Sequence, residues 1–116
     1  MKKIGLVVSF VLMGSILFAQ SLDEGKQFLN YERYESAQGV FQKLMAADPK
    51  NEEAIYWMGQ TYLENQDIVD TTSAKELYQK ALEANPKSPL MIVGMGQVEL
   101  REGKTDDARN RFETAI

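Results

Sequence analysis

The sequence repeats itself along most of its length, with two related spacings. Glycine, alanine, aromatic and proline residues recur 34 or 37 positions apart. The pairs at 34 are Gly25 and Gly59, Phe28 and Tyr62, Ala74 and Ala108, Tyr78 and Phe112, and Ala81 and Ala115; those at 37 are Ala37 and Ala74, Phe41 and Tyr78, Pro49 and Pro86, and Gly59 and Gly96. A single insertion of three residues between Tyr62 and Ala74 explains both spacings. A period of this length is typical of stacked helical units, each of which buries its apolar face against the next.

Local signals place two helices in each copy of the repeat. In the second copy, Ile55, Met58 and Tyr62 follow one another at helical spacing. Asn51 and Ser88 are suited to cap helix starts, and we expect Ser73 to do the same through a capping box. The predicted helices lie near 21–30, 34–47, 52–65, 72–84, 89–102 and 105–116.

Three glycines fall in the middle of predicted helices, at positions 25, 59 and 96. Glycine costs about 1 kcal/mol relative to alanine inside a helix. We therefore expect the neighbouring helix to approach closely at each glycine, with Ala37, Ala74 and Ala108 as the matching contacts.

On these residues the chain resembles the tetratricopeptide repeat family. The residues that carry the resemblance are Gly25, Phe28, Ala37, Phe41 and Pro49, then Gly59, Tyr62, Ala74, Tyr78, Ala81 and Pro86, then Gly96, Ala108, Phe112 and Ala115. The resemblance implies an all-α fold, an α-α superhelix that forms a right-handed solenoid of antiparallel helix hairpins with about three repeat units. The units are expected near 21–51, 52–88 (with the insertion between its helices) and 89–116 (truncated). Glu99 departs from the pattern, because Phe28 and Tyr62 supply an aromatic ring at the equivalent position.

The first residues are typical of a secretory signal peptide. A basic start, Met1-Lys2-Lys3, precedes an apolar run over 4–18 and the small-residue exit Ala19-Gln20-Ser21. The run is shorter than the roughly 20 residues that a membrane span needs. We expect a signal over 1–21, cleaved after Ala19 or Ser21, and a repeat array over 22–116. The predicted location is the periplasm or cell envelope, with membrane contact only before cleavage.

The composition excludes several kinds of chemistry. The chain has no Cys and no His, so disulfides, thiolate zinc sites and histidine-based catalysis are ruled out. A formal charge of −4 disfavours nucleic acid as a partner. The G-x-G at 94–96 lacks a preceding strand and a third glycine, and Asp67 and Asp70 lack the spacing of a calcium loop. We expect no catalytic, cofactor-binding or metal-binding residue, no cofactor, no small-molecule substrate, and hence no enzyme.

The resemblance also implies where a partner would bind. In tetratricopeptide arrays the first helix of each hairpin lines a concave groove. The side chains expected to line this groove mix aromatic, amide and charged groups, which suit a peptide or a partner helix. They are Lys26, Asn30, Tyr56, Trp57, Gln60, Glu64, Val93, Gln97 and Arg101. Trp57 is either an interaction hot spot or a residue buried against the first hairpin.

The function expected from these observations is a non-catalytic scaffold, exported to the cell envelope, that binds a protein or peptide. One alternative is a structural or assembly component of an envelope complex. Another is an N-terminal repeat module of a longer protein, whose catalytic or other domain follows Ile116. The third copy stops inside its second helix, so we expect that Ile116 is not the natural end and that Phe112 and Ile116 form an open apolar face.

Overall fold

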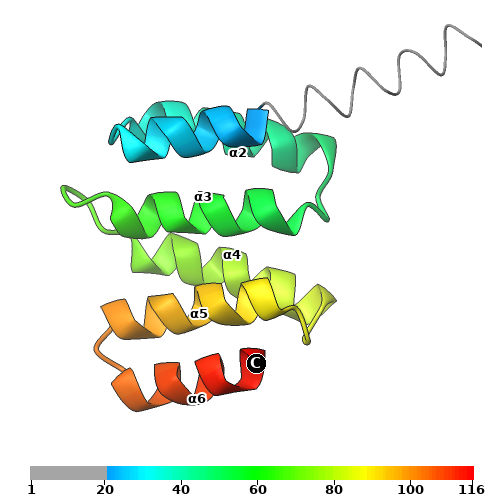
Figure 1. Cartoon of the computed structure of the whole chain (residues 1–116), viewed down its shortest axis with the longest axis vertical. Helices are drawn as coiled ribbons and strands as arrows, with labels where there is room; N and C mark the ends of the chain where they lie inside the picture. The colour runs from blue at the N-terminus through cyan, green and yellow to red at the C-terminus, as the bar shows by residue number, and fades with distance from the viewer. Residues whose placement is uncertain (1–20) are drawn as a thin grey trace, which may run out of the picture.

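The computed structural model describes residues 21–116, which form helices and no strand (Figure 1). The helices comprise residues 21–30, α2 (Tyr34–Ala47), α3 (Glu52–Glu64), α4 (Thr71–Ala84), α5 (Pro89–Arg101) and α6 (Thr105–Ala115). These bounds agree with the predicted ranges to within one residue. Consecutive helices run antiparallel and stack as three hairpins, which confirms the predicted all-α solenoid.

The predicted signal peptide lies almost entirely outside the described residues, since it covers 1–21. Within 21–116, no helix has the length and apolar character needed to cross a membrane.

Side-chain caps fix the starts of three helices. The Asn51 side chain accepts a hydrogen bond from the Ala54 backbone N–H (3.2 Å), and Ser88 Oγ accepts one from the Met91 N–H (3.4 Å). The expectation that Ser73 caps the fourth helix was wrong. Asp70 caps α4 instead, because its carboxylate accepts hydrogen bonds from the Ser73 N–H (2.9 Å) and hydroxyl (2.6 Å). A carboxylate at this position satisfies a helix N–H and also faces the positive end of the helix dipole.

The three-residue insertion lies in the loop between α3 and α4. The Asp70 N–H donates to the Tyr62 carbonyl (3.0 Å), so the backbone closes the loop just before α4 begins. Inside the loop the Asn65 side chain accepts hydrogen bonds from the backbone N–H groups of Asp67 and Ile68. The insertion therefore forms a hydrogen-bonded surface loop and leaves both helices intact.

Two clusters of buried side chains hold the hairpins together. One cluster joins the first and second hairpins: Leu29, Ala37, Phe41, Leu44, Ala54 and Met58. The other joins the second and third hairpins: Ile55, Leu63, Ala74, Tyr78, Met91, Met95 and Val98. The α3 helix contributes to both clusters, so it forms the centre of the stack.

The glycines inside the helices mark close contacts, as expected, but the contacting group differs from the prediction. A Cβ atom added to Gly25 or Gly96 would lie 2.5 Å from a ring carbon of Phe41 or Phe112, and one added to Gly59 would overlap the Tyr78 ring. The expected contacts, Ala37, Ala74 and Ala108, are fully buried, but the atoms nearest to each glycine belong to the aromatic ring four residues further along the same helix. Each hairpin is thus closed by a ring lying over a glycine.

Tyr78 also reaches the next hairpin. A Cβ atom added to Gly94 of α5 would lie 2.7 Å from Cζ of the Tyr78 ring. The ring is therefore held between Gly59 of α3 and Gly94 of α5. Its hydroxyl donates a hydrogen bond to the Tyr56 carbonyl (2.7 Å), which fixes its depth between the two helices.

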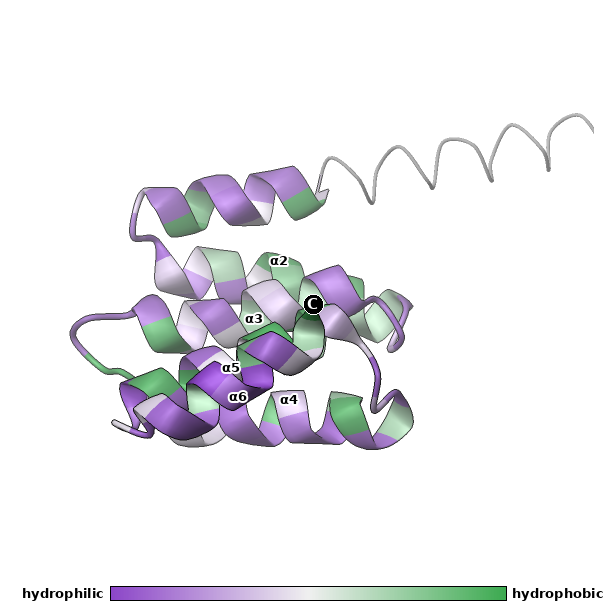
Figure 2. Ribbon diagram, turned by 60° about the horizontal axis from the view of Figure 1, so that its bottom comes forward, coloured by the Kyte–Doolittle hydropathy of each residue, from purple (hydrophilic) through white to green (hydrophobic). Residues whose placement is uncertain are grey.

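The α6 helix is mostly hydrophilic along its exposed side (Figure 2). Phe112 is half-buried whereas its equivalents Phe41 and Tyr78 are fully buried, so the open apolar face expected with Ile116 stays a prediction. The Phe112 ring packs over Gly96 of α5, whereas Ile116 is exposed.

Replacing Gly59 by alanine is expected to destabilise the fold by at least about 1–3 kcal/mol, since the new methyl group would overlap the Tyr78 ring. Gly39 provides a matched control. It also lies inside a helix, but a Cβ atom there would meet nothing within 4 Å, so Gly39→Ala should stabilise the protein by about 0.5–1 kcal/mol. Urea unfolding followed by circular dichroism measures both effects. Equal shifts in the two variants would contradict the close contact.

Candidate functional site

The first helices of the three hairpins carry the residues predicted to bind a partner, and α3 packs directly against α5. We call the surface formed by these residues the first-helix face. Its members are Lys26, Asn30, Tyr56, Trp57, Gln60, Glu64, Val93, Gln97 and Arg101. Asn30 and Arg101 are exposed, Gln60 is buried, and the other members are half-buried.

Trp57 connects the first two hairpins. The Lys26 ammonium lies 5.1 Å from the centre of the Trp57 ring, at a distance typical of a cation–π interaction. The Trp57 ring also meets the Tyr56 ring edge-on, with the ring centres 5.3 Å apart and the planes at 83°. Trp57 is thus half-buried against the first hairpin while part of its surface stays accessible. The position is compatible with both roles considered from the sequence.

Gln60 and Gln97 connect the second hairpin to the third. The Gln60 side-chain amide donates to the Tyr78 hydroxyl (3.0 Å) and to the Gln97 side-chain oxygen. The Tyr56 hydroxyl lies 3.4 Å from the Gln97 Oε1 and 3.3 Å from its Nε2, so a hydrogen bond between these groups can run in either direction. Gln60 is only 7% exposed, because its amide satisfies the buried Tyr78 hydroxyl, and it therefore lies beneath the surface on which we had expected it.

The Tyr78 hydroxyl is the buried member of this hydrogen-bond network. Burial of the ring raises the pKa of Tyr78 well above its usual value, so the hydroxyl stays protonated and remains a donor at any physiological pH. In the sequence, Tyr78 stands out only as a member of the repeat pattern. A buried tyrosine needs a hydrogen-bond partner. This requirement is the feature of the sequence that indicates a polar side chain, such as that of Gln60, close to the Tyr78 hydroxyl.

The other end of the first-helix face is formed by Glu64, Asn30 and Arg101. Together with Leu29, Glu32, Tyr34 and Gln66 they line a recess of about 430 Å³. The Tyr34 hydroxyl donates a hydrogen bond to the Glu64 carbonyl (3.1 Å) and so ties the first hairpin to the second at this point. The repeat pattern did not point to Tyr34 or Gln66, because both follow the first helices of their hairpins.

Burial raises the pKa of the Glu64 carboxyl above the usual glutamate value, although the positive charge of Arg101 acts in the opposite direction. The recess thus holds a partly desolvated carboxylate beside a guanidinium group. Such a pair suits a polar or charged group of a bound partner.

Val93 lies one helical turn before Gln97 on α5. It provides an apolar position between the hydrogen-bond network and the start of that helix.

No cluster of three or more acidic side chains in the described part of the chain is arranged to hold a metal ion. The first-helix face offers hydrogen-bonding groups, aromatic surface, and a carboxylate and a guanidinium that line the same recess.

Replacing Glu64 by glutamine is expected to stabilise the protein at neutral pH. Because the folded-state pKa is raised, folding favours the protonated form, and stability falls as pH rises through that pKa. The variant should melt about 1–3 °C higher than the wild type at pH 7, a small effect for a partly solvated group, and the difference should vanish below about pH 4. Thermal melts across this pH range measure it. Glu76→Gln, which removes the same charge from an exposed site on α4, is the control, and an equal gain there would disprove the role of burial.

The sequence model of the family described as "Anaphase-promoting complex, cyclosome, subunit 3" matches residues 30–115. No curated protein sequence matches the chain significantly.

Solved structures that share the fold include those of SycD and MamA. SycD, the Type III secretion translocator chaperone of Yersinia enterocolitica, is similar with a TM-score of 0.69 and 18% identity, over 84% of this chain and 72% of SycD. The MamA RS-1 ArsTM double mutant is similar with a TM-score of 0.64 and 23% identity, over 84% of this chain and 53% of that protein. A crystal structure of MamA gives a TM-score of 0.57 and 22% identity, over 78% of this chain and 52% of that protein. The chain thus spans about half the length of the two MamA chains, and at these identities the likeness concerns the fold.

Proposed function

Since the chain belongs to the family described as anaphase-promoting complex, cyclosome, subunit 3, a family of tetratricopeptide-type repeats, we propose that it is a non-catalytic scaffold that binds a protein or peptide on its first-helix face. Proteins with this fold typically act through contacts with other proteins. SycD, which shares the fold, is a chaperone for a secretion translocator, and a partner of the same class, a protein segment, is proposed here.

The observation that carries the proposal is the pairing of half-buried aromatic rings with side-chain amides across α3 and α5. Tyr56, Gln60 and Gln97 are linked by hydrogen bonds, so their positions are fixed before a partner arrives. A fixed set of donors and acceptors lowers the entropic cost of binding. An extended peptide has a backbone N–H and C=O at every residue, and the half-buried Gln97 amide, which Gln60 holds in place, can pair with them.

Trp57 supplies the apolar part of the same surface. Trp and Tyr dominate the energetics of protein interfaces because they bury a large area with few rotatable bonds. The cation–π contact with Lys26 holds the Trp57 ring in place, and the Tyr56 ring beside it widens the aromatic surface. A peptide with an apolar side chain at this point and a polar one near Glu64 and Arg101 fits the whole first-helix face.

The binding prediction is tested with a displayed library of random 12-residue peptides, selected on residues 22–116. A selected peptide should bind Trp57→Ala at least about 30-fold more weakly than wild type, which corresponds to about 2 kcal/mol for an aromatic hot spot. Tyr31→Ala is the matched control, because Tyr31 is 76% exposed and lies in the turn after the first helix, outside the first-helix face. Isothermal titration calorimetry gives both affinities, and thermal melts check that each variant is folded.

Equal affinities of Trp57→Ala and wild type for every selected peptide would place the binding surface elsewhere on the solenoid. Loss of binding in Tyr31→Ala to the same extent would show that the effect is not specific to the first-helix face.

We also propose that the protein is exported to the periplasm or cell envelope and that residues 22–116 form the repeat array of the mature protein. The support is the layout of the first 21 residues, in which two lysines precede an apolar run and small residues follow it.

Export predicts a defined new N-terminus. In a bacterial host with a two-membrane envelope, the full chain should appear in the periplasmic fraction beginning at Gln20 or Leu22, after cleavage following Ala19 or Ser21. Intact mass and N-terminal sequencing distinguish the two sites. Leu12→Arg, which places a charge in the apolar run, should leave uncleaved protein in the cytoplasm. Cytoplasmic wild-type protein that retains Met1 would contradict the proposal.

A further inference from the structure

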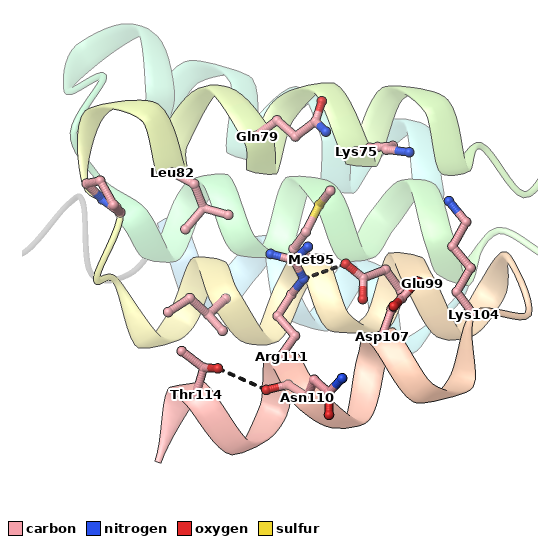
Figure 3. Close-up of a pocket in the computed structure, with 12 residues that line it drawn as sticks. Lys75, Gln79, Leu82, Met95, Glu99, Lys104, Asp107, Asn110, Arg111 and Thr114 are labelled. Atoms are coloured by element: carbon pink, nitrogen blue, oxygen red, sulfur yellow. Dashed lines mark hydrogen bonds and ion pairs between the residues drawn. The ribbon is translucent and has the colours of Figure 1, made fainter.

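A cleft of about 710 Å³ opens between α4 and α6, and its lining also includes residues of α5 (Figure 3). It shares no residue with the first-helix face. Part of the lining is apolar, with Leu82 from α4 and Ile92 and Met95 from α5. The carboxylate of Glu99 lies beside this apolar part, and Arg111 of α6 reaches it from the facing helix.

The equivalent position between the first and second hairpins holds an aromatic ring. There, Met58 and Tyr62 of α3 line a recess of about 400 Å³ between α2 and α4. They stand 37 residues before Met95 and Glu99, which is the spacing of the repeat. Tyr62 is half-buried and packs against both core clusters. The later cleft has a carboxylate where the earlier recess has a ring, and its volume is about 710 Å³ against about 400 Å³.

Glu99 is buried without being fully paired. The residue is 5% exposed, and its Oε1 accepts a hydrogen bond from the Arg111 Nε, with which it forms an ion pair. Its Oε2 is buried and accepts no hydrogen bond from any residue of the described chain. A buried acceptor without a donor is costly, so a guest that supplies an O–H or N–H group gains from satisfying it. Glu99 itself lines the cleft, so a guest that reaches its carboxylate can supply this donor.

The charges around the cleft favour a neutral donor. Lys75, Lys104 and Arg111 line it together with Glu99 and Asp107, and Glu102 forms ion pairs with both lysines, so these six charges cancel. A guest cation would find no net negative charge here and would be repelled by the guanidinium already paired with Glu99. A guest anion would offer no donor to Oε2. A neutral hydroxyl on an apolar ring matches both the acceptor and the apolar lining.

We propose that the cleft between α4 and α6 binds a tyrosine side chain of a partner protein. The ring packs on Leu82, Ile92 and Met95, in the space that Tyr62 fills one repeat earlier. The phenol hydroxyl donates to Glu99 Oε2, while Arg111 stays on Oε1. This site is separate from the first-helix face, so either can fail experimentally while the other stands.

The test uses the pentapeptide Ac-Ala-Ala-Tyr-Ala-Ala-NH2 and its Phe counterpart, titrated into ¹⁵N-labelled protein and followed by NMR. We expect the Tyr peptide to bind about tenfold more tightly than the Phe peptide, because only its hydroxyl satisfies the buried acceptor. The shifted signals should be those of Leu82, Met95, Glu99 and the Arg111 side-chain Nε–H. Glu99→Gln should reduce the Tyr preference severalfold. Glu99→Tyr, which restores the ring of the earlier repeat, should abolish binding of both peptides while the protein stays folded by thermal melt.

Equal binding of the two peptides, shifts confined to Trp57 and its neighbours, or unchanged binding to Glu99→Tyr would each overturn the proposal. A second copy of the chain is the competing occupant, since Tyr31 is 76% exposed. Sedimentation analysis tests this alternative. If the wild type is a dimer and Tyr31→Ala is a monomer, the cleft serves self-association and the proposal of a separate partner is overturned. A monomeric wild-type protein with the expected Tyr preference supports it.

Discussion

The distance between the second and third hairpins is set by one ring, that of Tyr78, held between Gly59 and Gly94. Only glycine leaves room for an aromatic side chain at such close approach, so the two helices cannot move together or apart without losing this contact. The Tyr78 hydroxyl then anchors the Tyr56 carbonyl and receives the Gln60 amide. The arrangement of polar groups on the first-helix face therefore depends on packing in the layer beneath it.

The sequence predicted the helices well because the signals for them are local. Caps, prolines and the spacing of apolar residues act within one turn, and every observed helix bound lies within one residue of its prediction. The contact partners of the glycines were predicted less well. The spacing shows that a residue must be small, but the direction of the Phe41, Tyr78 and Phe112 rings depends on side-chain torsions that only the packed structure fixes.

In the candidate site, too, the sequence predicts local features better than contacts between distant residues. The positions on the first helices follow from helical periodicity, whereas the pairings of Lys26 with Trp57 and of Gln60 with Gln97 join residues that lie more than 30 positions apart. Glu99 is a clear case, because two arginines, Arg109 and Arg111, follow it in the next helix. These two residues point in very different directions on α6, and the register of α5 against α6 brings Arg111 to the carboxylate.

The loop between α3 and α4 absorbs three extra residues without disturbing the helices on either side. Its ends are closed by the Asp70 to Tyr62 hydrogen bond, and Ile68 and Val69 at its tip are exposed. Changes in this segment are thus decoupled from the ring-over-glycine contacts that hold the hairpins. Over evolutionary time such a loop can lengthen, shorten or acquire new side chains under weak constraint, so related proteins can diversify their outer edge while keeping one inherited scaffold.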